Sequence, residues 1–257
     1  MMRFEGKTVL ISGATGGFGH GAAKAFAAEG AQLLLTDLPG SRLEEVAAAI
    51  DGPVEVLAGD VTDPAHHAAL VARAMDHFGA LDIAVNNAGI VNRPARTEEI
   101  GAEEARRVIE VDLLGVFFAL QAQIPAMQAQ FRADGRTGAI VNVASVAGLV
   151  GSATLSIYAA AKHGVVGLTR TAAVENARRG IRVNAICPSF ARTAMVDQTL
   201  AHAPDPAAAE AELVRGVPMR RIAEPAEIVQ AILWAAAPEN SFMTGQTLAL
   251  DGGITAY

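Results

Sequence analysis

The chain has 257 residues, of which 51% are hydrophobic, so it is long enough for one large α/β domain and too apolar for a disordered chain. Its 27 acidic residues outnumber its 20 Lys and Arg, giving a formal net charge of −7, which argues against a nucleic acid or an anionic membrane as partner. A single cysteine, Cys187, excludes an intrachain disulfide, and the N-terminus lacks a signal-peptide layout, so we expect a cytoplasmic protein.

Short apolar runs alternate with longer amphipathic stretches over the whole chain. We expect strands at Thr8–Ser12, Gln32–Thr36, Val54–Ala58, Ile83–Asn86, Ala139–Val143, Val183–Ile186 and Thr247–Leu250. We expect helices at Gly19–Glu29, Ser41–Ile50, Ala65–Phe78, Ala102–Gln130, Ser156–Arg178 and Ala226–Ala237. Ser41 and Asp63 are predicted N-caps, and Pro64 and Pro225 suit a first helical position. The alternation predicts a single α/β domain, residues 1–257, built on a doubly wound parallel sheet of about seven strands with helices on both faces.

Two stretches depart from this alternation. Residues 139–161 carry no charge, but their Asn, Ser, Thr and Gly residues make them too polar and broken for a membrane span. Residues 189–224 contain several prolines around a short Ala/Glu-rich helix. A loop of that length in a compact domain is usually functional, so we predict a lid over a substrate.

A glycine-rich turn follows the first predicted strand and opens the first helix. Gly13, Gly17 and Gly19 have the spacing G-x-x-x-G-x-G, and Thr15 and Phe18 lie in the same turn. Glycines allow the backbone to approach a pyrophosphate, and the helix N-terminus supplies free N–H groups and a positive dipole end. The alternative is an ordinary glycine-rich turn.

Asp37 stands at the end of the second predicted strand, where a carboxylate can accept both ribose hydroxyls of an adenosine. It would repel a 2′-phosphate, and neither Thr15 nor Leu38 offers that phosphate a positive charge. We therefore predict NAD as the cofactor rather than NADP. The alternative is a solvated Asp in the turn before Pro39 and Gly40.

Tyr158 and Lys162 are four residues apart, which places them on one face of a predicted helix. Free tyrosine, with a pKa near 10, is a poor base at neutral pH, but a nearby ammonium favours the phenolate and lowers that pKa. Such a phenol can exchange a proton with a substrate oxygen. The alternative is a packed Tyr beside a Lys that reaches to solvent.

Ser145 follows the fifth predicted strand, at the edge where parallel sheets bind ligands. Its hydroxyl is placed to donate to a carbonyl oxygen of a substrate. Taken alone, the same position also suits a Ser that caps a turn.

Together these motifs resemble the short-chain dehydrogenase/reductase family, in its short single-domain subgroup, over essentially the whole chain. Ser145 and the Tyr158–Lys162 pair match the catalytic Ser and the Y-x-x-x-K motif, and Ser12 stands where Thr is usual before the glycines. Further matches are Asp60-Val61, Asn86-Asn87-Ala88-Gly89, the segment from Pro188 to Thr193, and Asp251-Gly252-Gly253. The resemblance implies a Rossmann-type fold with adenine near Asp60 and Val61.

The resemblance also implies which further residues contact the cofactor. These are Asn87, Ala88 and Gly89 after the fourth strand, Pro188 and Thr193 beside the nicotinamide, and Lys162 at its ribose. Family members commonly form tetramers, so we expect a homo-oligomer.

Two residues depart from the family pattern. Asp112 replaces the fourth catalytic residue, an Asn that helps to hold a water in a proton relay to the Lys. An ionised carboxylate there can pair with Lys162, so we expect activity with an altered pH dependence. Ser189 replaces the Gly of the P-G-x-x-x-T motif, which can reshape the entrance to the lid.

The expected function is reversible hydride transfer between NAD(H) and a secondary alcohol or ketone. The predicted substrate wall is mostly apolar and comprises Ala147, Leu149, Val150, Thr154, Phe190 and Met195. It favours a small or medium cyclic or aliphatic alcohol, while Arg93 and Arg192 leave a carboxylate-bearing substrate open. The six histidines show no metal-ligand spacing, so we expect no metal site. The non-enzymatic alternative is an NAD(H)-binding sensor or scaffold whose active site has drifted.

Overall fold

A single parallel sheet forms the centre of the molecule in the computed structural model, which describes residues 2–193, 196–197, 200 and 203–256. Its strand order is β3-β2-β1-β4-β5-β6-β7. The strands are β1 (Thr8–Ser12), β2 (Gln32–Thr36), β3 (Val54–Val56), β4 (Ile83–Asn86), β5 (Gly138–Val143), β6 (Ile181–Pro188) and β7 (Thr247–Leu250). The predicted doubly wound sheet of seven strands is confirmed, although β3 is shorter and β6 longer than expected.

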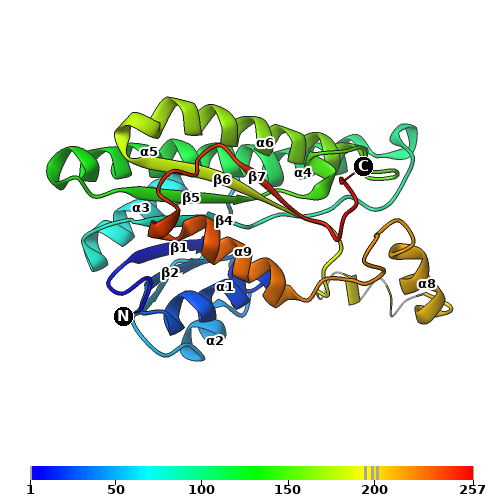
Figure 1. Cartoon of the computed structure of the whole chain (residues 1–257), viewed down its shortest axis with the longest axis horizontal. Helices are drawn as coiled ribbons and strands as arrows, with labels where there is room; N and C mark the ends of the chain where they lie inside the picture. The colour runs from blue at the N-terminus through cyan, green and yellow to red at the C-terminus, as the bar shows by residue number, and fades with distance from the viewer. Residues whose placement is uncertain (1, 194–195, 198–199, 201–202, 257) are drawn as a thin grey trace.

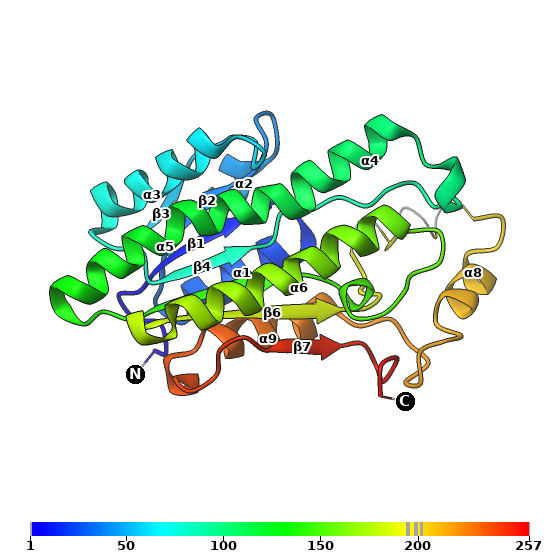
Figure 2. The same cartoon turned by 90° about the horizontal axis from the view of Figure 1, so that it is seen from above.

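Helices cover both faces of the sheet (Figure 1). One face carries α1 (Gly17–Ala28), α2 (Leu43–Ala48) and α9 (Pro225–Ala236). The other carries α3 (Pro64–Phe78), α5 (Gly115–Asp134) and α6 (Ser156–Asn176), with α4 (Ala102–Ile109) running on into α5. A short helix, α8 (Pro206–Leu213), stands apart at the end of the molecule toward which the strands point (Figure 2).

Each strand buries side chains on both faces, because each face of the sheet has its own apolar core. In β1, Val9 and Ile11 pack toward α1 and α9, whereas Leu10 packs toward α3, α5 and α6. This alternation explains why β1 is apolar at its centre, as strands of a fully covered parallel sheet are.

Arg182 of β6 joins the strand to the end of α9. Its guanidinium donates to the carbonyl oxygens of Ala235, Ala236 and Ala237 in the last turn of the helix and to that of Met243 beyond it. A cation here satisfies carbonyls that the helix leaves unpaired and complements the negative end of the helix dipole. Burial of the guanidinium lowers its pKa from the ordinary value.

Three of the four predicted helix-start residues are confirmed. Asp63 caps α3 by accepting from the backbone N–H of Ala65 at 2.9 Å, and Pro64 and Pro225 are the first residues of α3 and α9. Ser41 as an N-cap is wrong. Its backbone N–H donates to the carbonyl of Leu38, so the chain is still in a turn at Ser41, and α2 begins two residues later.

The helix expected over Ala102–Gln130 is present as the continuous stretch Ala102–Asp134, but it is not regular. A π-helical turn, Glu110–Leu114, separates α4 from α5. Here the helix passes close to two neighbours, since Asp112 bonds the backbone of Ile90 and a Cβ at Gly115 would lie 3.2 Å from Val61. Such local widening of a helix is common at functional sites.

The stretch Ala102–Asp134, taken as one helix, is long and apolar enough to cross a membrane. In the fold, however, α5 packs on α3 and on the sheet through Val116, Leu120 and Met127. This is the position of a core helix in a folded domain.

Candidate active site

The predicted site residues gather at the carboxyl ends of the central strands, on the side of the sheet where α8 lies (Figure 2). The first residues after β1, β4, β5 and β6 meet there because parallel strands end at one edge. Strand order also reverses at β1 and β4, which is where open α/β sheets bind ligands.

The glycine turn has the tight geometry that its spacing predicts. Gly13 adopts φ +63°, and a Cβ on it would lie 2.9 Å from the Cα of Ala88. A Cβ at Gly19 would overlap the carbonyl oxygen of Gly13. At the start of α1, Gly16 in the N-cap position gives no side-chain cap, so the first helical amides are available for an anion. These features fit the pyrophosphate of a dinucleotide.

Asn87 ties the turn after β4 to the glycine turn. Its Nδ2 donates to the carbonyl oxygens of Ser12 and Gly13, both at 3.0 Å. In return, the hydroxyl of Ser12 accepts from the backbone N–H groups of Asn87 and Ala88. Asn87 and Ala88 therefore hold the backbone of the glycine turn in place.

Asp37 lies just after β2 with its carboxylate directed at the glycine turn. Its Oδ2 accepts from the backbone N–H of Thr15 at 2.9 Å and from the hydroxyl of Thr15 at 2.7 Å. Its Oδ1 accepts from the N–H of Leu38. Because Oδ1 has a second lone pair free for a hydroxyl, this arrangement fits a ribose.

The side chain of Asp60 is occupied by protein partners. Its Oδ1 accepts from the backbone and hydroxyl of Thr62, and its Oδ2 pairs with Arg107 at 3.1 Å. Partial burial acts to raise the pKa of Asp60, but the Thr62 hydrogen bonds and the Arg107 charge outweigh it and lower the pKa.

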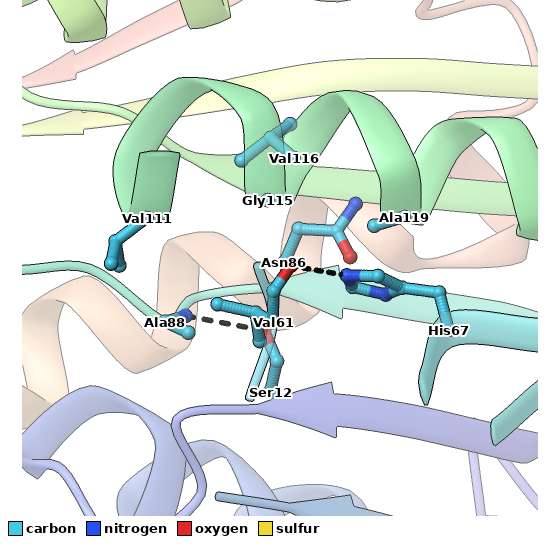
Figure 3. A pocket seen from close by; sticks show the side chains of 9 residues that line it. All are labelled: Ser12, Val61, His67, Asn86, Ala88, Val111, Gly115, Val116 and Ala119. Atoms are coloured by element: carbon cyan, nitrogen blue, oxygen red, sulfur yellow. Dashed lines mark hydrogen bonds between the residues drawn. The ribbon is translucent and has the colours of Figure 1, made fainter. Parts of the chain in front are cut away.

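Next to it, Val61 borders a small recess between the ends of β1 and β4 and the start of α5 (Figure 3). The Nε2 of His67, from α3, is within hydrogen-bond distance of the carbonyl oxygen of Val61, at 2.8 Å. The recess is lined by Ser12, Val61, His67, Asn86, Ala88, Val111, Gly115, Val116 and Ala119.

Tyr158 and Lys162 lie on one face of α6, as predicted. The Nζ of Lys162 is 5.5 Å from the centre of the Tyr158 ring and donates to the carbonyl of Val143 at 3.1 Å. Lys162 is only 3% exposed, whereas Tyr158 is partly exposed. Val143 was missed from the sequence because a backbone carbonyl leaves no signal in it.

Asp112, in the π-helical turn, completes the surroundings of Lys162. Its Oδ2 lies 3.2 Å from Nζ, and its Oδ1 accepts from the N–H of Ile90 at 2.8 Å. The pairing with Lys162 that an ionised Asp112 suggested is therefore present in the structure. Burial is the strongest single influence and acts to lower the pKa of Lys162, but Asp112, Tyr158 and Cys187 together outweigh it and raise that pKa.

Ser145 begins the short 3₁₀ turn Val146–Gly148 after β5. Its hydroxyl is buried, accepts from the N–H of Ala147 at 3.2 Å and lies 3.5 Å from the carbonyl of Pro188. The turn packs tightly on α6, since a Cβ at Gly148 would lie 2.7 Å from the carbonyl oxygen of Lys162. Ser145 is thus held against the helix that carries Tyr158 and Lys162, and it also caps the turn.

The segment after β6 returns toward the glycine turn. Thr193 lies directly over it, since a Cβ at Gly17 would be 3.2 Å from Cγ2 of Thr193. The backbones of Ala191 and Ala223 pair as an isolated bridge, which joins the two ends of the predicted lid segment. Between them, α8 confirms the short helix expected there.

The predicted substrate wall is only partly assembled. Val150 and Thr154 are exposed, Ala147 is buried in the turn beside α6, and Phe190 packs on the apolar cluster of Leu200, Val214, Val217 and Ile222. Met195 lies outside the described residues. Thr154 adopts φ +67°, an uncommon backbone conformation for a non-glycine residue.

The two arginines left open as carboxylate partners differ. Arg192 is ion-paired with Glu210 of α8 at 2.7 Å, with Asp197 and Glu224 nearby, so its charge is already compensated. Arg93 is exposed and makes no ion pair with any residue that the structure describes. Of the two, only Arg93 has a charge that no described residue compensates.

A larger pocket, of about 420 Å³, lies elsewhere, between the end of the lid segment, β7 and the start of α9. It includes Ser189, Arg221, Glu227 and Asp251 but none of Ser145, Tyr158 and Lys162. In residues 2–193, 196–197, 200 and 203–256, no group of three or more His, Cys, Asp or Glu side chains could hold a metal ion.

Comparisons with known proteins agree with this geometry. A family model described as enoyl-(acyl carrier protein) reductase matches residues 13–255. Cyclohexanol dehydrogenase of Acinetobacter sp. (strain SE19) is 37% identical over 257 residues, which cover 99% of this chain and 97% of that protein. Trans-4-hydroxycyclohexanecarboxylate dehydrogenase of Sinomonas cyclohexanicum is 40% identical over 266 residues, covering 99% and 95%.

Among solved structures, 3-ketoacyl-(acyl-carrier-protein) reductase from Brucella melitensis, complexed with NADH, superposes with a TM-score of 0.89. It is 33% identical, and the match covers 98% of this chain and 99% of that one. A nicotinamide cofactor therefore accompanies this fold and these motifs in a relative. The chain belongs to the short-chain dehydrogenase/reductase family of oxidoreductases.

Proposed function

We propose that this protein interconverts a cyclic secondary alcohol and the corresponding ketone, with NAD(H) as the hydride carrier. The observation that carries the proposal is the buried ammonium of Lys162, 5.5 Å from the Tyr158 ring, at the sheet edge that also holds the glycine turn. A phenol beside a fixed cation is suited to exchange a proton with an alcohol.

Three side chains share the chemistry. Ser145 holds the substrate oxygen through its hydroxyl. Tyr158, as phenolate, takes the hydroxyl proton during oxidation and returns it during reduction. Lys162 stabilises the phenolate and would hold the ribose of the cofactor with its remaining donor. A nicotinamide, when bound, would supply the acceptor for the hydride of the substrate carbon.

The glycine turn and Asp37 support NAD as the cofactor. The amides at the start of α1 would hold the pyrophosphate, and the carboxylate fixed by Thr15 and Leu38 would accept the ribose hydroxyls. A 2′-phosphate would meet the charge of Asp37. In this proposal Asn87, Ala88, Gly89, Pro188 and Thr193 also contact the cofactor, and Asp60 and Val61 contact its adenine.

The substrate class rests on the relatives, because the predicted apolar wall is only partly assembled in the structure. Two of them are named for oxidation of a ring alcohol, cyclohexanol and 4-hydroxycyclohexanecarboxylate. In this proposal residues 189–224 act as the lid, since their ends are pinned together while α8 stands clear of the sheet. The enzyme would work in the cytoplasm as a homo-oligomer, a tetramer by analogy with the family.

The test is NADH formation from NAD⁺ with a panel of cyclic and acyclic secondary alcohols, run in parallel with NADP⁺. We expect turnover with NAD⁺ and a ring alcohol. Tyr158→Phe should lose about 10²–10⁴-fold in kcat while still binding NADH, because it lacks only the transferable proton. NADH binding with no turnover of any alcohol or ketone would contradict the proposal and indicate a non-catalytic NAD-binding protein.

A further inference from the structure

Position 112 is enclosed by hydrogen-bond donors. Asp112 is fully buried, and its two oxygens face different partners. Its Oδ1 accepts from the backbone N–H of Ile90 at 2.8 Å, and its Oδ2 lies 3.2 Å from the ammonium of Lys162. Oδ2 makes no hydrogen bond with the described residues, so its contact with the Lys162 ammonium is an ion pair. A carboxylate is the side chain that offers an acceptor to each of these two donors.

An amide at this position would satisfy only one of them. If its oxygen stayed on the N–H of Ile90, its NH₂ group would face the ammonium of Lys162, donor against donor. If the amide turned over, the NH₂ group would face the N–H of Ile90 instead. The surroundings of position 112 therefore select Asp over Asn, the residue that is usual in the family.

The ion pair of Asp112 and Lys162 is buried and closely packed by neighbouring elements. A Cβ at Gly89 would lie 3.3 Å from both Oδ2 of Asp112 and Nζ of Lys162, so the turn after β4 closes over the pair. The carbonyl of Val143 holds the ammonium from β5. Three elements thus meet at one buried ammonium, and a buried charge without its partner is costly.

Two other titratable groups act on Lys162: Tyr158, on its own helix, and Cys187 of β6. Burial raises the pKa of the Cys187 thiol to about 11, so that group carries no charge at neutral pH. The negative charge that balances Lys162 before Tyr158 ionises is therefore that of Asp112.

We propose that Asp112 is a positioning residue: as the ionised counter-ion of Lys162, it fixes the ammonium between Val143 and Gly89 and offsets part of its charge at Tyr158. This inference rests on the proposed pairing of Lys162 with Tyr158. The proposal predicts a measurable effect of having Asp112 where the family usually has Asn: Tyr158 should ionise at a higher pH with Asp112 than with Asn at that position.

The sequence offers a direct readout, because the chain has only two tyrosines. In a Tyr257→Phe background, the ultraviolet absorbance of tyrosinate reports Tyr158 alone. Asp112→Asn should move that titration about one pH unit toward acid, since it removes a negative charge that opposes the phenolate. No shift, or a shift toward alkali, would overturn the proposal.

Asp82→Asn is the matched control. Asp82 is another buried, ion-paired aspartate, but it precedes β4, at the opposite end of that strand from Asn87 and Gly89. Its substitution should leave the Tyr158 titration unchanged. An equal shift in this variant would attribute the effect to general loosening of the fold and overturn the proposal.

The temperature of thermal unfolding gives a second test of the proposal, and this test remains usable if Asp112→Asn is too unstable for the titration. Asp112→Asn leaves a buried ammonium unpaired, whereas Asp112→Asn with Lys162→Met removes both charges. The double variant should therefore unfold at a higher temperature than Asp112→Asn. A double variant no more stable than Asp112→Asn would show that the two charges are not coupled and would overturn the proposal.

Both readouts work without substrate, so they separate this inference from the proposed function. A shifted titration together with a rescued double variant would support Asp112 even if no alcohol were turned over. Turnover of a ring alcohol with neither effect would leave the proposed function standing and refute the role of Asp112.

Discussion

Asp37 both shapes the glycine turn and is the residue predicted to bind the ribose of the cofactor. Through one oxygen it fixes the backbone and hydroxyl of Thr15, and through the other it remains open to a further donor. Any substitution of Asp37 therefore affects the turn as well as the predicted ribose contact. The two effects can be separated, because the Thr15 hydroxyl can be removed without removing the charge.

Asp37→Ala should weaken NADH binding about 10–100-fold and bring NADPH closer to NADH in affinity. Hydrogen bonds to a charged group contribute about 1.5–3 kcal/mol, and about 1.4 kcal/mol is tenfold in affinity. Fluorescence titration with each cofactor measures this. Thr15→Val, which removes the bond at 2.7 Å but keeps the carboxylate, should keep the preference for NADH. A wild-type protein that binds NADPH more tightly would contradict the role of Asp37.

The proposed catalytic pair and its proposed counter-ion differ in how far the sequence can predict them. Tyr158 and Lys162 are local, since a spacing of four residues in a helix fixes a common face. Asp112 is 50 residues from Lys162, so their contact could be suspected from charge but placed only by the fold. Their other partners are backbone atoms: the carbonyl oxygen of Val143 accepts from Lys162, and the N–H of Ile90 donates to Asp112. Every residue type carries such atoms, so the sequence does not predict which ones take part.

Among the secondary-structure elements, α3 has an unusual feature, two adjacent buried histidines. His66 meets the hydroxyl of Thr36 at 2.8 Å, just before Asp37, and His67 meets the carbonyl of Val61 at 2.8 Å. Burial lowers the pKa of His66 despite the nearby charges of Asp63 and Asp60, and it lowers that of His67 despite the bond to Val61. The start of α3 therefore depends on both rings being neutral.

The protein should lose stability as the pH falls below about 6.5. Each His binds its proton more weakly in the folded state than in the unfolded chain, whose pKa is about 6.5. Below that pH the unfolded chain takes up more protons, and folding becomes less favourable. We expect a loss of about 1 kcal/mol between roughly pH 7.5 and pH 5.5, measured by urea unfolding.

His66→Gln should reduce this pH dependence, and His77→Gln, at an exposed site on the same helix, should leave it intact. If His66→Gln retained the full loss of stability at low pH, other groups would have to account for it.

The predicted elements succeeded where local pattern decides and failed where tertiary contacts do. Five strands were placed within one residue at each end, because short apolar runs bounded by turns are distinctive. The long helix from Ala102 was predicted, but its π-helical turn, Glu110–Leu114, was not, because the amphipathic pattern of the sequence continues through these residues. In that turn Asp112 contacts Ile90 and Lys162, which are distant from it in the sequence, so a local pattern could not predict the widened turn.

At the scale of the whole molecule, the two ends of the sheet have different tasks. The carboxyl ends hold the candidate active site. At the other end Asp82 is 2% exposed and receives two bonds from Arg136 at 2.7 Å, one from Lys7 and one from the N–H of Thr8. This cluster joins the starts of β1, β4 and β5.

Asp82→Asn should destabilise the fold while leaving catalysis unchanged. Breaking a buried ion pair costs about 3–5 kcal/mol, because the remaining charges lose their partner. The midpoint of thermal unfolding should fall by roughly 6–15 °C for a chain of this size. Steady-state kinetics at a temperature where the variant is folded should give an unchanged kcat/KM. A tenfold loss of kcat/KM would show that the two ends are coupled.

The hydrogen bonds from Arg182 to the end of α9 and to Met243 have a consequence for folding during synthesis. Met243 lies 61 residues after Arg182, so the complete set of hydrogen bonds cannot form until that much more chain has left the ribosome. At about 5–20 residues per second, this takes about 3–12 s. During that interval β6 waits for β7, its neighbour on the outer side, and presents an open strand edge. During this interval the nascent chain therefore offers an unpaired strand edge to chaperones and to aggregation.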